Sequence, residues 1–119
     1  MPIFGLTPMF DEQRHDRPHR YELQDRYLEL TRTELPAAAR LGKWVVTEDH
    51  CFMRIILDQL FQGCWYDHLD RRLVAYKQLN DEQLTRAIAM GEQLLTGDIT
   101  TLNRWNNESL AWRGKQKRK

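Results

Sequence analysis

The sequence predicts an all-α protein, a compact single-domain bundle of four to six helices with a flexible N-terminal lead and a basic C-terminal tail. A length of 119 residues suits one domain with one core. Apolar residues recur at helical spacing from about residue 19 onward. The β-favouring run at residues 43–46 is too short and too isolated to form a sheet, so we expect an extended connector there.

The composition is that of an ordinary soluble domain, with 41% hydrophobic and 29% charged residues. It argues against a disordered chain, a collagen-like repeat and a disulfide-rich scaffold. No stretch approaches the ~20 apolar residues that cross a bilayer. The first residues also lack the basic start, the apolar run and the cleavage site of a secretory signal. We therefore expect a cytoplasmic protein without membrane contact.

The first helix is expected to begin at His19, after a lead segment at residues 1–18 that three prolines and a glycine interrupt. Its apolar residues follow a helical spacing: Leu23, Tyr27, Leu30. Pro36 should kink or restart this helix, because proline lacks the amide hydrogen of the helical ladder. Gly42 is a plausible cap for the short segment that follows.

The most hydrophobic segment predicts a central helix that Thr47 caps and that ends before Gly63. Its apolar stripe consists of Phe52, Ile55, Ile56 and Leu60, and it is widened by Met53 and Leu57. A turn or short helical piece is expected at residues 64–69, and one more short apolar segment at residues 73–79.

The last two helices have the clearest caps. Asn80 opens one and Gly97 ends it, while Asp98 opens the other and Gly114 closes it. Their buried faces are expected to comprise Leu84, Ala87, Ile88, Gly91, Leu94 and Leu95 in the first, and Leu102, Trp105, Ser109 and Trp112 in the second. The helical domain thus spans residues 19–114 and the basic tail residues 115–119.

A polar stripe on the central helix is the main candidate for a binding site. His50, Arg54 and Asp58 recur every four residues, so they should share one face. The candidate pocket adds the polar run that follows the helix: Trp65, Tyr66, Asp67, His68. In a pocket, a histidine could transfer protons and Arg54 could hold an anion. The alternative is a surface ion pair between Arg54 and Asp58.

Other chemistries are poorly matched by the sequence. Cys51 and Cys64 are thirteen residues apart at the two ends of the central helix, too far for a disulfide, so we expect two free thiols. The same distance argues against a zinc site that would combine them with His50 and His68. No glycine-rich nucleotide loop is present, and Ser109 is interpreted as a packing residue. No metal or cofactor is predicted.

The C-terminal residues concentrate positive charge. Residues 113–119 hold five of the 18 basic residues and no acidic one, so the preceding chain has 13 basic and 17 acidic residues. The candidate polyanion-binding residues are Arg113, Lys115, Lys117, Arg118 and Lys119. Such a tail can contact nucleic-acid phosphates or another polyanion. The alternative is a flexible, solubilising end.

Several runs resemble a family of short bacterial proteins that often carry the label GNAT-like N-acetyltransferase. The runs are DHCFMRIILD at residues 49–58, WYDH at 65–68, AYKQL at 75–79 and SLAWRGK at 109–115. The resemblance, over about residues 20–115, implies that the candidate pocket belongs to the family pattern, and the label implies acyl transfer from acetyl-coenzyme A. A GNAT domain, however, uses a mixed β-sheet and a glycine-containing pyrophosphate loop, and this chain has neither pattern.

Three functions are compatible with the sequence. The first is a small cytosolic binding or accessory protein, with a polar pocket or partner surface and a tail that touches nucleic acid. The second is an enzyme of the acetyltransferase-labelled family. The third is a helical oligomerisation or interaction domain, whose partner is a protein or a second copy of the chain.

Removal of residues 113–119 is expected to abolish any salt-dependent binding to DNA or RNA, because these residues release counterions from the phosphates. Titrations of the full and the shortened chain at low and raised salt measure this. Binding that survives the deletion, or no binding by the full chain at low salt, would contradict the nucleic-acid hypothesis.

Overall fold

Helices make up almost the whole of the described chain. The computed structural model describes the backbone of residues 8–114 and the side chains of residues 19–114. The elements are α1 (Pro8–Glu29), the π-helical turn η1 (Leu30–Glu34), α2 (Leu35–Gly42), α3 (Asp49–Phe61), the 3-10 turn η2 (Trp65–Asp67), α4 (Ala75–Gln78), α5 (Asp81–Leu95) and α6 (Ile99–Trp112). No strand occurs within residues 8–114, which confirms the all-α prediction.

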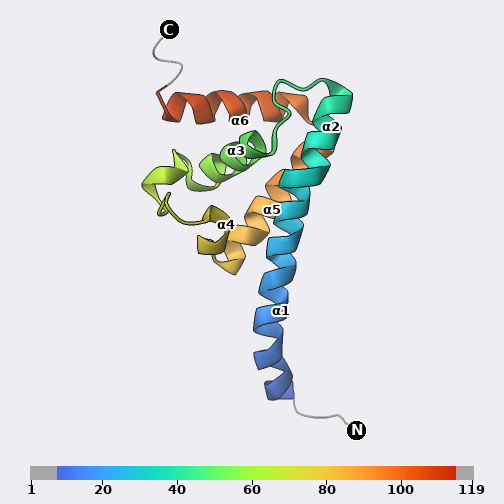
Figure 1. Cartoon of the computed structure of the whole chain (residues 1–119), viewed down its shortest axis with the longest axis vertical. Helices are drawn as coiled ribbons and strands as arrows, with labels where there is room; N and C mark the ends of the chain where they lie inside the picture. The colour runs from blue at the N-terminus through green and yellow to red at the C-terminus, as the bar shows by residue number, and fades with distance from the viewer. Residues whose placement is uncertain (1–7, 115–119) are drawn as a thin grey trace.

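The arrangement centres on α3. α1, η1 and α2 follow one another as one long helical rod, and α5 packs beside it (Figure 1). α3 contacts η1, α2, α5, α6 and η2, so it lies in the middle of the bundle. The first turns of α1 extend beyond the other helices (Figure 1). Within residues 8–114, no helix is both long enough and apolar enough to cross a membrane.

The core is built mainly from α3 and the helices around it. On α3, Phe52, Ile55 and Ile56 have no exposed surface, as expected for the central helix. The other core residues are Leu57 and Leu60 of α3, Leu79 directly after α4, and residues of the rod, α5 and α6: Tyr27, Leu30, Leu35, Ala39, Leu84, Ala87, Ile88, Leu94, Leu102. On α5, Gly91 lets Leu30 approach closely, because a Cβ atom there would lie 3.2 Å from Leu30 Cδ1. Trp112, expected in the core, is 37% exposed and lies at its edge.

The start of α1 differs from the prediction. The helix begins at Pro8, eleven residues before His19. Proline is tolerated in a first helical turn, where its missing amide hydrogen would have no partner. Good helix formers follow in the sequence. Residues 1–7 of the expected lead segment lie outside the described residues.

The restart expected at Pro36 takes the form of a π-helical turn. η1 widens the helix just before Pro36, which lies in the first turn of α2. The Leu35 amide donates to the Leu30 carbonyl, five residues back. The fully buried Thr31 hydroxyl donates to the Tyr27 carbonyl over 3.0 Å. The rod therefore continues past the proline with one turn of different register.

Two caps are shifted by one residue. The left-handed residue that ends α2 is Lys43, with φ at 57°, and Gly42 is the last helical residue. Gly42 is needed for space, because a Cβ atom there would lie 2.5 Å from Trp44 Nε1. The cap of α3 is Glu48, whose carboxylate accepts a hydrogen bond from the Thr47 hydroxyl. Thr47 is therefore not the cap residue, and it only donates a hydrogen bond to the cap residue Glu48.

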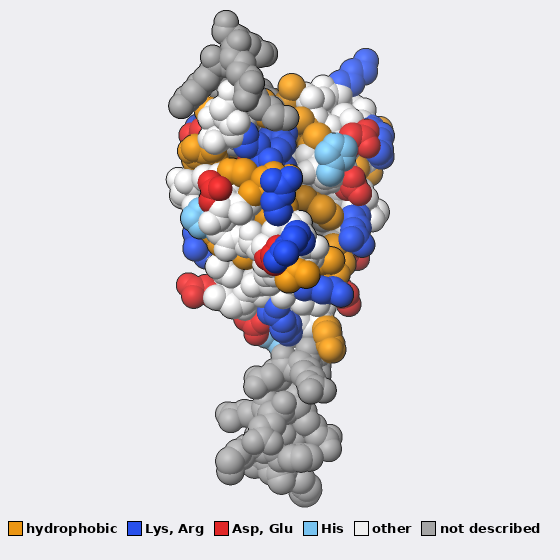
Figure 2. Space-filling view, turned by 60° about the vertical axis from the view of Figure 1, so that its left-hand side comes forward, with side chains coloured by type: hydrophobic (Ala, Val, Ile, Leu, Met, Phe, Trp, Pro, Cys, Tyr) orange, Lys and Arg blue, Asp and Glu red, His pale blue; other side chains and the backbone are white. Residues whose placement is uncertain are grey.

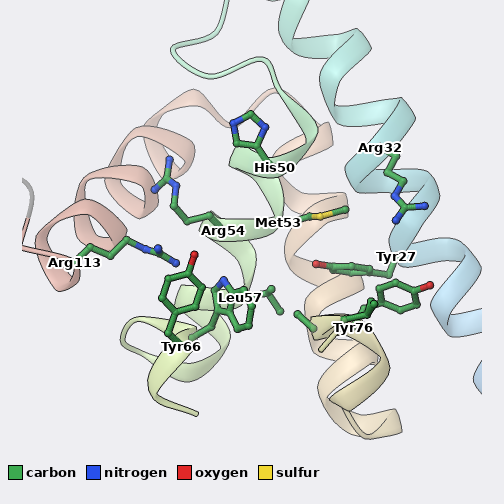
Figure 3. Close-up of a pocket in the computed structure, with 12 residues that line it drawn as sticks. Tyr27, Arg32, His50, Met53, Arg54, Leu57, Tyr66, Tyr76 and Arg113 are labelled. Atoms are coloured by element: carbon green, nitrogen blue, oxygen red, sulfur yellow. The ribbon is translucent and has the colours of Figure 1, made fainter. Parts of the chain in front are cut away.

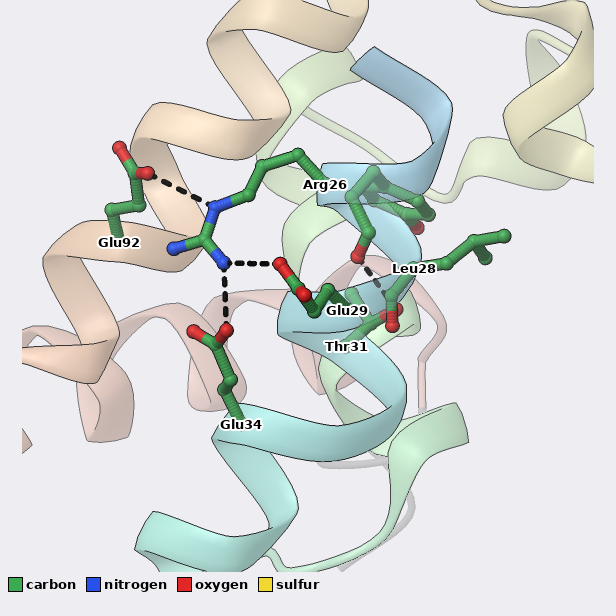
Figure 4. Close-up of polar contacts among 7 residues, drawn as sticks. Arg26, Leu28, Glu29, Thr31, Glu34 and Glu92 are labelled. Carbon is green, nitrogen blue, oxygen red and sulfur yellow. Dashed lines mark hydrogen bonds and ion pairs between the residues drawn. The ribbon is translucent and has the colours of Figure 1, made fainter. Parts of the chain in front are cut away.

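A network around Arg26 ties the rod to α5 (Figure 4). Its guanidinium donates to Glu34 at 2.8 Å, to Glu29 at 2.9 Å and to Glu92 of α5 at 3.3 Å. The hydrogen bond to Glu34 is the main reason why the pKa of Arg26 lies above its usual value. Each exposed pair contributes only a few tenths of a kcal/mol, but three carboxylates on one guanidinium fix its geometry.

Asn80→Ala is expected to lower the free energy of unfolding by about 1 kcal/mol. In the capping box at the start of α5, Asn80 Oδ1 accepts from the Gln83 amide at 2.8 Å, and Gln83 Oε1 accepts from the Asn80 amide at 2.9 Å. Urea denaturation measures the change. Asn103→Ala, at an exposed position inside α6, is the control and should not destabilise the protein. Equal stability of the two variants would refute the capping role.

Candidate functional site

A buried carboxylate lies at the centre of the polar stripe on α3. Asp58 has no exposed surface, and its two oxygens accept four hydrogen bonds. Oδ1 accepts from the Trp65 amide at 2.9 Å and from Arg113 at 3.1 Å. Oδ2 accepts from the Ser109 hydroxyl at 2.5 Å and from Arg113 Nε at 2.8 Å. One side chain thus joins α3 to η2, to α6 and to the residue that follows α6.

Arg113 is the charged partner of Asp58. The pair is bidentate, and the Arg113 side chain is only 12% exposed. Burial acts to lower the pKa of Arg113, but the hydrogen bonds and the charge of Asp58 outweigh it and raise that pKa above its usual value. Arg113 therefore differs from its prediction as a polyanion-binding residue, because its charge is already paired inside the protein.

The other four candidate polyanion-binding residues, Lys115, Lys117, Arg118 and Lys119, lie outside the described residues. A truncation that starts at Lys115 leaves the Arg113–Asp58 pair intact. It is therefore a sharper test of nucleic-acid binding than removal of residues 113–119.

Arg54 and Asp58 do not pair directly, in contrast to the surface ion pair considered above. Arg54 donates to Ser109 Oγ and to Asn106 Oδ1 on α6, both at 2.8 Å. Ser109 donates its single hydrogen to Asp58, so it accepts from Arg54. Ser109 is therefore more than the packing residue that the sequence suggested. It links the two charged side chains.

Arg54, Asp58, Asn106, Ser109 and Arg113 form one hydrogen-bonded cluster. Every buried side-chain nitrogen or oxygen within the described part of the chain has a hydrogen-bond partner. A buried charge is tolerated only when its donors and acceptors are matched, and removal of one partner leaves the other charge uncompensated. The cluster therefore fixes α6 against α3 and specifies their register.

A pocket of about 360 Å³ opens beside this cluster (Figure 3). Its walls come from α1, η1, α3, η2, the segment around α4, and the end of α6. The lining residues are Tyr27, Arg32, His50, Met53, Arg54, Leu57, Trp65, Tyr66, Val74, Ala75, Tyr76 and Arg113. Most of these side chains are apolar or aromatic, so the pocket is a concave, largely apolar site with a few polar groups.

The structure brings together four of the seven residues predicted for the pocket. His50, Arg54, Trp65 and Tyr66 line it, and Asp58 lies behind it in the buried cluster. The two remaining residues lie elsewhere. Asp67 lines a shallower hollow beside Trp112, and His68 is exposed and stacks on Phe61 with ring centroids 4.9 Å apart.

Tyr66 separates the two hollows. The guanidinium carbons of Arg71 and Arg113 lie over its ring, 4.4 Å and 4.8 Å from the ring centroid. Trp65 packs edge-on against Tyr66, with ring centroids 4.7 Å apart. Cation–π contacts of this kind orient the ring. The pocket wall at η2 is therefore fixed by a backbone hydrogen bond, from the Trp65 amide to Asp58, and by the side-chain contacts of Tyr66.

The pocket residues that the sequence did not suggest come from the rod and from α4. They include Tyr27, Arg32 and Tyr76. Helical spacing assigns Tyr27 to a buried face, but it does not say which helices face each other. For Ser109 and Arg113 a signal was present. Ser109 and Arg113 are four residues apart at the end of α6, and Arg54 and Asp58 are four residues apart on α3. Arg54 contacts Ser109, and Asp58 contacts Arg113, so the two pairs face each other.

The charge of the pocket lining is positive. Three arginines and one histidine contribute to it, and no acidic residue does among the described residues that line it. Asp58 neutralises one of these arginines, Arg113. Figure 2 shows one face of the molecule, where Lys and Arg side chains lie among hydrophobic ones, with acidic side chains between them.

The metal and thiol candidates stay apart. Cys51 and Cys64 are both free, as predicted, and are half-buried at either end of α3. Within the described residues, no three His, Cys, Asp or Glu side chains gather in a way that could hold a metal ion.

Comparison with protein-family models, curated proteins and solved structures gives no match. The resemblance to the acetyltransferase-labelled family therefore stays a prediction.

Asp58→Asn is expected to lower the free energy of unfolding by about 3 kcal/mol, because it leaves the guanidinium of Arg113 buried without a counter-charge. Denaturant titration measures the loss. Asp67→Asn, the same change at an exposed position on η2, is the control and should shift stability by less than about 0.5 kcal/mol.

A double-variant cycle sharpens this test. Because the two charges lie in one network, D58N combined with Arg113→Gln should cost less than the two single changes added together. Strictly additive losses would show that the two charges do not stabilise each other.

Proposed function

We propose that this protein is a non-catalytic binding protein, which holds a small, partly apolar molecule in the pocket between the rod, α3, η2 and α4. The observation that carries the proposal is the pocket itself. Its volume of about 360 Å³ falls in the range of small-molecule sites, and its walls come from segments far apart in the sequence. Such a pocket exists only in the folded chain, so ligand binding should stabilise the fold.

The chemistry of the lining suits binding. The Leu57 and Met53 side chains and the rings of Trp65 and Tyr76 offer apolar contact, and polar groups occur at a few places around them. Aromatic walls bury ligand surface at low entropic cost because their side chains are already held by packing. Trp65 is held by the hydrogen bond that its backbone amide donates to Asp58, and Tyr76 lies against Tyr27 with ring centroids 6.1 Å apart.

The reactive groups nearest the pocket are engaged in structural bonds. Ser109, the single serine of the chain, has no exposed surface, and its hydroxyl hydrogen is bound by Asp58. A serine nucleophile needs a neighbouring base that can take its proton and a path to the substrate. Asp58 is instead committed to Arg113 and to the Trp65 amide. This arrangement supports a holding role for the cluster.

The acyl-transfer alternative can be examined in the same titrations. Acetyl-coenzyme A is much larger than a pocket of about 360 Å³ could enclose, so its nucleotide would have to lie outside the pocket. We expect no saturable heat of binding from acetyl-coenzyme A at millimolar concentration. A saturable heat, accompanied by a raised melting temperature, would favour the enzyme instead.

The substitution Val74→Trp should fill the pocket from its exposed rim and weaken binding of naphthalene probes by about tenfold or more. Val74 lines the pocket and is 50% exposed, so a larger side chain there need not disturb the core. The probes are naphthoate, naphthamide and naphthylmethylammonium, titrated by calorimetry. Val45→Trp is the matched control, because Val45 is 65% exposed in the connector before α3 and does not line the pocket.

The three probes share an apolar ring and differ in charge, so the experiment tests the pocket without assuming a ligand charge. The proposal fails if none of them binds the unchanged protein. It also fails if Val74→Trp and Val45→Trp have the same effect.

A further inference from the structure

The π-helical turn η1 lies directly beside the pocket and supplies one of its basic residues. Turns of this kind are rare and frequently occur at functional sites. η1 follows the stretch of α1 that carries Tyr27, and it contains Arg32. In a regular α-helix, two residues five apart are separated by about 140° around the axis, at about 3.6 residues per turn, so they would point in different directions.

In this protein Tyr27 and Arg32 face the same pocket. Both line it, and Figure 3 shows the Arg32 guanidinium extending from η1 towards the Tyr27 ring. The positive charge of Arg32 also acts on the Tyr27 hydroxyl. Burial raises the pKa of Tyr27 above its usual value, and Arg32 lowers it in part. The wider turn thus brings a cation and a phenol to one side of the pocket.

The Tyr27 hydroxyl faces the pocket. Tyr27 lines the pocket, although only 1% of its surface is exposed. In Figure 3 its hydroxyl oxygen points into the pocket. Because the phenol stays protonated at neutral pH, it can donate a hydrogen bond to an oxygen of the ligand.

Arg32 is the complementary charge. Its side chain is exposed, and it makes no ion pair within the described part of the chain. The neighbouring charges of the pocket are Arg54, Arg113 and, when protonated, His50, so no carboxylate of the lining competes for it. A guanidinium recognises a carboxylate or phosphate through its planar set of donors.

From this geometry we infer that the ligand is a small organic anion, whose acidic group lies between Arg32 and the Tyr27 hydroxyl while its apolar part contacts Met53, Leu57 and Tyr76. This inference rests on the proposed binding function and adds the chemical class of the ligand. The pocket provides the two parts of the recognition separately, since the cation comes from η1 and the apolar floor from α3 and α4.

The test compares the same three naphthalene probes on four versions of the full chain. The unchanged protein should bind naphthoate about tenfold more tightly than naphthamide, and naphthylmethylammonium least tightly. Arg32→Gln should remove most of the preference for naphthoate over naphthamide, because it removes the charge that distinguishes the two probes. Tyr27→Phe should weaken naphthoate binding about threefold to tenfold, because it removes a hydroxyl that points into the pocket.

Arg40→Gln is the matched control. Arg40 is an exposed arginine of α2, in the same rod, and does not line the pocket. It should leave the binding of all three probes unchanged. Equal effects of Arg32→Gln and Arg40→Gln would show that only the general charge of the protein matters, and would overturn the inference.

Two failures can be told apart. If naphthamide or naphthylmethylammonium binds as tightly as naphthoate, and Val74→Trp still weakens this binding, the pocket binds ligands but the anion inference is wrong. If no probe binds the unchanged protein, both the inference and the proposed function are wrong.

Discussion

Asp58 has no contact with solvent, so its negative charge must be met by donors from the protein itself. Those donors come from three separate places: the Trp65 amide of η2, the Ser109 hydroxyl of α6, and the guanidinium of Arg113. Because each donor must reach one carboxylate on α3, the positions of η2 and α6 are fixed together. The wall of the pocket at Trp65 and Tyr66 follows from this constraint, and so does the place where Arg113 enters it.

The opposite wall has a different origin. It depends on the rod, where a proline at position 36 follows a π-helical turn. The buried Thr31 hydroxyl stabilises the turn by donating a hydrogen bond to the Tyr27 carbonyl. Arg26 donates hydrogen bonds to Glu34 of the turn and to Glu92 of α5. The two walls of the pocket are therefore held by different sets of hydrogen bonds. This separation is what makes single substitutions at the pocket informative.

Local chemistry made much of the fold predictable. Asn80 and Asp98 cap the helices that they were expected to cap, because a side-chain oxygen before a helix satisfies its free amides. The buried stripe of α3 follows from its helical spacing. The start of α1 was not predicted, since three prolines within residues 1–18 suggested interruption, whereas one of them begins a helix and another lies inside it. The shift from Gly42 to Lys43 depends on Trp44, which a local pattern does not place.

The candidate site was predictable only on the α3 side. The stripe of Arg54 and Asp58 was found because both residues lie on one helix, and Trp65 and Tyr66 because they follow it. Their partners Ser109 and Arg113 were assigned to packing and to the basic tail, since helix pairing is a long-range property. Tyr27 and Arg32 were not found at all. Their convergence needs a π-helical turn, and a sequence read at 3.6 residues per turn places them apart.

The pairing of Arg113 also determines where the protein can be modified. Arg113 lines both the pocket and the shallower hollow, so anything attached after Gly114 starts at the edge of both. At the other end, α1 has 22 residues, about 33 Å of helix, and its first turns lead away from the bundle (Figure 1). A surface-immobilised form attached before α1 would keep the pocket open.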